Sequence, residues 1–173
     1  MAARHPLSYE FYERHSPQLE IFGGPNFFPE ELCQELVVIS DASEQRKLEF
    51  NFSYPVVEAD GLPDALRAAA EWADRYRAPV NTAILKRYDI HEPYQSAAYK
   101  PHRDPKIYQS QRIVLVSLSG EADITVTTSD GETSAFGCLP GTVLFIAPHI
   151  LHSVTEPLNP GGIRHFLFMG YKL

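Results

Sequence analysis

The string YKPHRDP holds the first pair of residues that could do chemistry, His102 and Asp104. The two are separated by one residue, and on an extended segment such residues point to the same side of the backbone. One imidazole and one carboxylate can therefore converge on a single ion. Taken alone, a His-x-Asp triplet is more often a surface pair than a metal site, so the rest of the chain has to supply a third ligand.

The later string FIAPHILHSV offers that ligand, as His149 or His152, at the end of an apolar run. Two imidazoles and one carboxylate on one face of a metal leave three positions open, which is the arrangement of non-haem iron(II) oxygenases. Open positions are needed because a co-substrate and dioxygen must both reach the iron. Each histidine alone is read more simply as a core or surface side chain.

An arginine follows these histidines at the start of the apolar string RHFLFMGY, as Arg164. An arginine buried in a core strand needs an anionic partner. A dicarboxylic co-substrate would provide one, because a planar guanidinium can donate two parallel hydrogen bonds to a carboxylate. The order of His-x-Asp, histidine and arginine therefore predicts a metal site beside an anion site.

The predicted secondary structure that must position these residues changes from helices to strands near residue 81. Before it, the segments 29–40 and 62–76 carry apolar residues at helical spacing, each with a proline near its start, and predict two helices. Residues 1–28 predict an irregular segment with one strand at LEIF. Residues 1–80 are thus expected to support the site rather than to form it.

Beyond residue 81 the chain consists of short apolar or alternating runs, which predict strands at TAILKRY, RIVLVSLS, ADITVTTS, TVLFIA, ILHSV and RHFLFMGY. Turn residues separate several of them, at 129–131, 139–141 and 159–162. Closely spaced strands of this size predict an antiparallel sandwich or jelly roll with the helices packed outside. We expect one domain over residues 1–173, with its jelly-roll core at 81–173.

Composition fits an ordinary globular protein and narrows the function classes. The chain has 173 residues, of which 44% are hydrophobic, and a formal charge of −7 with a pI near 5.4. It has no general basic field, which disfavours nucleic acid and anionic lipid as partners. Two distant cysteines without metal spacing and no apolar run of membrane length predict a cytoplasmic, unanchored protein. Nothing in the sequence indicates an oligomeric state.

From residue 81 onward, the ordered motifs resemble the iron(II)- and 2-oxoglutarate-dependent oxygenases of the double-stranded β-helix fold. The wording is nearest to AlkB-like members, whose strand before His-x-Asp reads approximately N-x-x-x-x-N-x-Y, similar to NTAILKRY here. The strings GTVLFIAP and LHSV are also similar to those that surround the family's distal histidine. The resemblance implies a mainly β fold of the jelly-roll or cupin-like kind, with iron(II), 2-oxoglutarate and dioxygen as cofactor and co-substrates.

The resemblance also implies a role for each matched residue. His102, Asp104 and His152 would bind the iron, with His152 favoured over His149 as the third ligand.

Arg164 would pair with the far carboxylate of 2-oxoglutarate, and Tyr88 would donate a hydrogen bond to it. Lys86 stands where the family has an asparagine that touches 2-oxoglutarate, so it is a cofactor-binding candidate that departs from the pattern.

Several functions fit these motifs. We expect oxidation, such as hydroxylation, of a small molecule such as an amino acid or a natural-product intermediate. The alternatives are an AlkB-like nucleic-acid demethylase, a peptidyl hydroxylase, and a non-catalytic cupin-like metal-binding domain. The string PHILH comes near a cupin motif, but Ile150 stands where that motif has glycine.

The stretch between Tyr88 and His102 is expected to overhang the site, and its candidate substrate contacts are His91, Tyr94, Tyr99 and Lys100. Arg112 faces either substrate or solvent, with solvent favoured. His165 should point to the opposite face of its strand from Arg164 and be structural.

Overall fold

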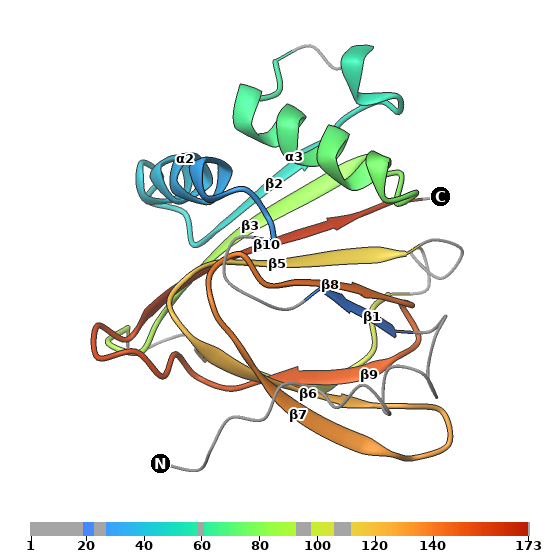
Figure 1. The fold of residues 1–173 in the computed structure, drawn as a ribbon. Coiled ribbons are helices and arrows are strands. Elements are labelled where there is room, and N and C mark those ends of the chain that lie inside the picture. Colours follow the sequence, from blue (N-terminus) through green and yellow to red (C-terminus); the bar gives the residue numbers. More distant parts are fainter. Residues whose placement is uncertain (1–18, 23–26, 59–60, 93–97, 106–111, 173) are drawn as a thin grey trace.

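The computed structural model describes residues 19–22, 27–58, 61–92, 98–105 and 112–172. Two antiparallel sheets face each other across a common interior (Figure 1). The six-stranded sheet has the order β1 (Leu19–Phe22), β8 (Val143–Ile146), β5 (Ile113–Ser119), β10 (Ile163–Gly170), β3 (Thr82–Asp89) and β2 (Lys47–Asn51). The four-stranded sheet has the order β4 (Tyr99–His102), β9 (Leu151–Val154), β6 (Ala122–Thr127) and β7 (Thr133–Cys138).

From β3 to β10 the chain passes repeatedly from one sheet to the other. β3, β5, β8 and β10 belong to the larger sheet, while β4, β6, β7 and β9 belong to the smaller one. This winding is that of a double-stranded β-helix, or jelly roll, so the predicted fold class is confirmed. The N-terminal part adds a strand at each edge of the larger sheet. The sequence predicted β1 but missed β2, β4 and β7.

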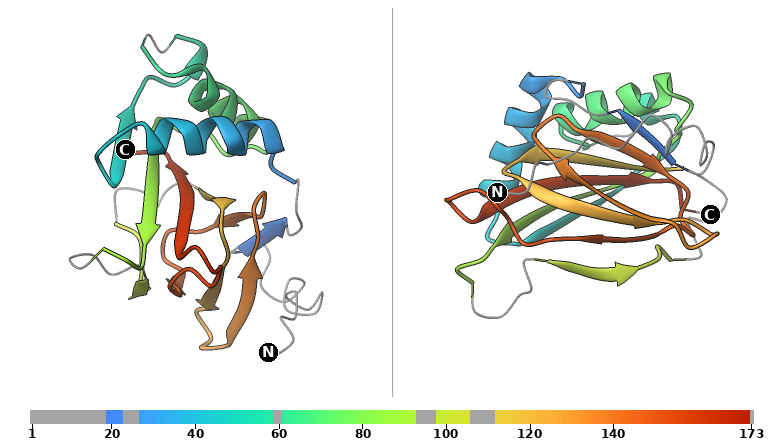
Figure 2. Two further views of the ribbon diagram at one scale, coloured as in Figure 1. Left: turned by 90° about the vertical axis from the view of Figure 1, so that its left-hand side faces the viewer. Right: turned by 60° about the horizontal axis from the view of Figure 1, so that its bottom comes forward.

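The two predicted helices are present as α2 (Glu30–Asp41) and α3 (Asp64–Arg75), and a 3-10 turn, η1, lies at Val56–Glu58. Both helices cover the outer face of the larger sheet, away from the smaller one (Figures 1 and 2). Trp72 of α3 packs its ring against Phe28 and Phe145 there. None of the described helices is long and apolar enough to cross a membrane.

The strands of the larger sheet send alternate side chains to its two faces. Leu85, Val116 and Leu167 belong to the core beneath the helices. Tyr88 and Phe166, which lie on the other face, belong to the core between the sheets. Because the side-chain period of a strand is two residues, the register of β3 and β10 decides which polar side chains reach the interior.

β10 pairs with β3 without a break along its whole length, so alternation along β10 places His165 on the helix-covered face and Arg164 on the inner face. The two side chains lie on opposite faces, as predicted. In the neighbouring β5, Leu118 is an extra residue between the partners of His165 and Phe166, and this bulge brings Ser119 to the same face as His165.

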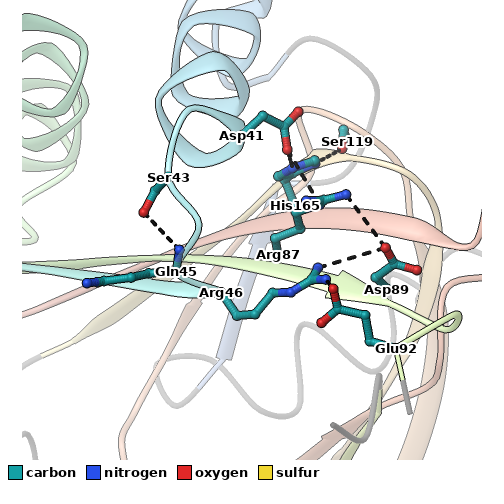
Figure 3. A network of polar contacts seen from close by, with 9 residues as sticks. All are labelled: Asp41, Ser43, Gln45, Arg46, Arg87, Asp89, Glu92, Ser119 and His165. Carbon is teal, nitrogen blue, oxygen red and sulfur yellow. Dashed lines mark hydrogen bonds and ion pairs between the residues drawn. The ribbon is translucent and has the colours of Figure 1, made fainter. Parts of the chain in front are cut away.

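His165 connects the end of α2 to the larger sheet (Figure 3). Its Nε2 donates to Oδ1 of Asp41 at 2.8 Å, and its Nδ1 lies 2.7 Å from the hydroxyl of Ser119. Arg87 of β3 approaches the same Asp41 oxygen at 3.5 Å. The structural role expected for His165 is confirmed by these contacts, which join one helix to three strands.

Replacing His165 with alanine should destabilise the fold, because it removes two hydrogen bonds and leaves a void beside the half-buried Ser119. We expect the free energy of unfolding, measured by urea titration, to fall by roughly 1–3 kcal/mol. Ser43→Ala is the control, since Ser43 makes an exposed local contact with the backbone of Gln45. Equal losses in the two variants would contradict this role.

Candidate metal centre

The pairing of β4 with β9 brings the first two candidate ligands together. His102 and His152 are direct partners across the two strands, and their ring centroids lie 4.4 Å apart. Asp104 follows β4, and its backbone N–H donates to the carbonyl of Pro148, in the turn before β9, at 3.0 Å. One ligand atom from each of the three side chains lies within 4.8 Å of the others. The structure thus forms a candidate site for a single metal ion.

Backbone carbonyls orient both imidazoles. Nδ1 of His102 is 2.8 Å from the carbonyl oxygen of Lys100, and Nδ1 of His152 is 3.0 Å from that of Ile150. A carbonyl oxygen only accepts, so each Nδ1 carries the proton and each Nε2 keeps its lone pair. This is the hydrogen-bonding pattern that holds histidines ready for a metal.

The carboxylate of Asp104 lies in a place where a cation would stabilise it. Its side chain is 8% exposed, and Oδ2 has no hydrogen-bond partner among the described residues. Oδ2 is 3.8 Å from Nε2 of His152. Burial raises the pKa of Asp104 and lowers the pKa of His152. Burial thus favours a neutral imidazole, the form that binds metals, and leaves an acidic oxygen in need of positive charge.

The structure separates the two histidines that the sequence left as alternatives. The side chain of His149 is exposed and is not part of the three-residue group. Its backbone carbonyl accepts a hydrogen bond from Nε of Arg103 at 3.0 Å. His149 therefore helps to hold the loop that carries Asp104, while its ring points elsewhere.

A cavity of about 330 Å³ lies between the sheets next to the three candidate ligands. Its inner wall comes from the larger sheet and is mostly apolar. The lining residues besides the three ligands are Lys47, Glu49, Ile84, Lys86, Tyr88, Tyr99, Pro105, Leu115, Val154, Arg164, Phe166, Phe168 and Lys172. All three residues proposed from the resemblance to contact 2-oxoglutarate are therefore in the wall of one cavity with the candidate ligands.

Arg164 is almost completely buried in this wall, with 1% of its surface exposed. It lies opposite Tyr88 in the β3–β10 pairing, and its guanidinium carbon is 4.3 Å from the centroid of that ring. Its Nε and Nη1 have no hydrogen-bond partner among the described residues. A buried guanidinium in this state fits an anion that enters the cavity.

Tyr88 and Lys86 lie two residues apart on β3 and face the same cavity. Burial raises the pKa of Tyr88, so its hydroxyl stays protonated and able to donate. Lys86 places its ammonium 4.3 Å from the ring centroid of Tyr99. Burial, with help from nearby Lys47, lowers the pKa of Lys86 to about 8.

The remaining predicted contacts divide between the cavity and the surface. Tyr99 lines the cavity, with its ring centroid 5.1 Å from that of His102. His91 and Lys100 are exposed and are not in the lining, while Tyr94 is outside the described residues.

Arg112 lies on the helix-covered face and so does not face the cavity. Its guanidinium is 5.0 Å from the ring centroid of Phe145, and Nη1 donates to the carbonyl of Tyr76 at 3.4 Å. Of the two predicted alternatives the structure favours solvent, although part of the side chain packs against this aromatic cluster.

Sequence reasoning missed the charged rim of the cavity. Glu49 of β2 contacts Lys47 at 3.2 Å and Lys172, near the C-terminus, at 2.5 Å. The only sequence signal was the polar–apolar alternation of KLEFN, which puts Lys47 and Glu49 on one face. Its nearness to the cavity follows from pairing with β3, which spacing along the chain does not show.

No protein-family model matches the chain, and no curated protein matches it. Solved structures of oxalate decarboxylase from Bacillus subtilis resemble part of it. The structure used to assign the Mn(II) centres of that protein has a TM-score of 0.41 and 21% identity over 53% of this chain. A mutant of the same protein gives 0.42 and 22%. In both cases the match covers 21% of the oxalate decarboxylase chain. Likeness at this level carries no information on the reaction.

Adding a divalent metal should raise the melting temperature of the protein. Anaerobic Fe(II) or Mn(II) at a hundredfold excess over Kd contributes about 2.7 kcal/mol. That corresponds to roughly 5–10 °C for a chain of this size. The shift should disappear in Asp104→Ala and His152→Ala, because each removes one ligand, and it should persist in His149→Ala. A shift lost in His149→Ala and retained in His152→Ala would contradict the site.

Proposed function

We propose that this protein is an iron(II)- and 2-oxoglutarate-dependent oxygenase that oxidises a small molecule. One observation carries the proposal: a three-residue candidate metal site shares a cavity with a buried guanidinium that has no described acidic partner. A metal site alone fits any cupin-like protein. The buried Arg164 needs an anionic partner as well. A keto acid with a second carboxylate would satisfy both groups, because its keto end would bind the metal and its far carboxylate would pair with Arg164.

Each group of the cavity has a defined task in this proposal. His102, Asp104 and His152 would hold the iron, in the two-histidine, one-carboxylate arrangement that leaves positions open. Arg164 would bind the far carboxylate of 2-oxoglutarate, and the protonated hydroxyl of Tyr88 would donate to it. Bound iron, together with 2-oxoglutarate and dioxygen, supplies the oxidation of an unreactive C–H bond.

The protein's own contribution is orientation and the exclusion of water. The carbonyls of Lys100 and Ile150 fix the ligand tautomers, so the metal site is organised before anything binds. Apolar side chains from the larger sheet, including Leu115 and Phe166, surround the reacting region and keep water from it. The cavity is therefore suited to a reaction whose oxidising species would otherwise react with solvent.

The size and charge of the site favour a small-molecule substrate over nucleic acid. A cavity of about 330 Å³ is at the lower end of small-ligand sites. The chain carries a formal charge of −7, which works against the electrostatic attraction that nucleic-acid binding needs. Demethylation of nucleic acid is therefore the weaker enzymatic alternative. A non-catalytic cupin-like domain would leave Arg164 without a purpose.

Anaerobic titration with Fe(II) and then 2-oxoglutarate tests the proposal. Chelation of the keto acid to the iron should produce a weak visible charge-transfer band. Arg164→Met should raise the 2-oxoglutarate concentration that gives half of the maximal band intensity by at least about 100-fold. The reason is that two charge-assisted hydrogen bonds contribute roughly 3 kcal/mol or more to binding.

Arg112→Met is the matched control, because it removes a guanidinium from the opposite face of the same sheet. It should leave the titration unchanged. Binding of Fe(II) without any band on addition of 2-oxoglutarate would overturn the proposal and favour the cupin-like metal-binding alternative.

Arg164→Met should also leave the apo-protein at least as stable as wild type. Methionine keeps much of the apolar packing over Tyr88 while it removes a buried charge that has no described acidic partner, and replacing buried charges in this way is often neutral or stabilising. Urea unfolding without metal or keto acid measures this. A loss of more than about 2 kcal/mol would mean that the guanidinium has a structural partner in the folded chain.

A further inference from the structure

Lys86 is a second cation in the cavity wall, displaced from Arg164. In the β3–β10 pairing Arg164 lies opposite Tyr88, whereas Lys86 lies opposite Phe166, two residues further along. Two residues of a strand span about 7 Å. A keto acid held between the metal site and Arg164 is thus directed along one part of the wall, and Lys86 faces another.

The acid at the rim is already shared by other lysines. Lys47 lies directly opposite Lys86 on β2, an arrangement of like charges that is unfavourable. Glu49 contacts Lys47 at 3.2 Å and Lys172 at 2.5 Å. No described residue forms an ion pair or hydrogen bond with Lys86, whose ammonium rests over the ring of Tyr99.

Lys86 also marks a way into the cavity. A second hollow, of about 630 Å³, lies over β2 and β3 and shares four lining residues with the cavity, namely Lys47, Lys86, Tyr88 and Tyr99. Because Lys86 belongs to both linings, a molecule that entered from this hollow would come close to its ammonium. Beyond Lys86 the wall carries the apolar side chains of Ile84 and Phe168. The only charged residues described there are Glu49, which lies opposite Ile84, and Lys172, and these two form an ion pair with each other.

We propose that the primary substrate is a small carboxylic acid with an apolar body, and that Lys86 binds its carboxylate. The inference rests on the proposed function. A carboxylate is favoured over a phosphate because Lys86 offers one positive charge, whereas a phosphate monoester carries nearly two negative charges. Burial and nearby Lys47 lower the pKa of Lys86 to about 8, although the carboxylates of Asp104 and Glu49 oppose this shift.

The test uses full-length protein loaded anaerobically with Fe(II) and 2-oxoglutarate. The probes are monocarboxylic acids of four to ten carbons, each paired with its primary amide. At least one acid should shift the charge-transfer band while its amide does not. In Lys86→Met, the concentration of that acid needed for a half-maximal shift of the band should rise at least tenfold. The concentration of 2-oxoglutarate needed to form the band should change less than threefold.

Arg75→Met is the matched control, because it removes one positive charge from the exposed last turn of α3 and should change neither titration. Absence of the band in wild type means that the proposed function itself fails. With the band present, the Lys86 inference is overturned if no acid shifts the band, if amides act as well as acids, or if Lys86→Met binds the acid normally. It is also overturned if Lys86→Met loses 2-oxoglutarate binding, because Lys86 would then hold the co-substrate.

Discussion

The arrangement of this cavity depends on one buried charge, the guanidinium of Arg164. It is enclosed between the two sheets and has no described acidic partner. Desolvating a cation without compensation is costly, so a fold that keeps Arg164 in its interior needs an anion to complete it. Alternation along β10 leaves His165 on the helix side, bonded to Asp41 and Ser119, while Arg164 faces the opposite sheet.

The smaller sheet, which faces Arg164, carries the candidate site for a metal cation. The β4–β9 pairing sets His102 against His152. Hydrogen bonds from the Asp104 N–H and the Arg103 side chain to the carbonyls of residues 148 and 149 bring the carboxylate to the same place. The cavity therefore has a wall prepared for an anion and a wall prepared for a metal. The proposed keto acid would link these two walls, and in the proposal Lys86 would bind the carboxylate of the substrate in the remaining space.

The helices and most strands were predictable, because the period of their apolar residues is long enough to be distinctive. β4 was missed because YKPH is short, contains Pro101 and pairs at few positions. The order of His-x-Asp, His152 and Arg164 predicted residues that the structure brings to one cavity. The charged rim around Glu49 was not predictable, since it depends on which strands pair. The position of Lys86 relative to Arg164 likewise required the β3–β10 register.

A crystal structure of the protein with Mn(II) and 2-oxoglutarate, prepared without oxygen, tests the central claim most directly. The account predicts one keto acid in the cavity, with its keto and adjacent carboxylate oxygens on a metal held by His102, Asp104 and His152. Its far carboxylate should lie within hydrogen-bonding distance of Arg164. A metal at these three residues with Arg164 still unpaired, or with the keto acid bound outside the cavity, would contradict it.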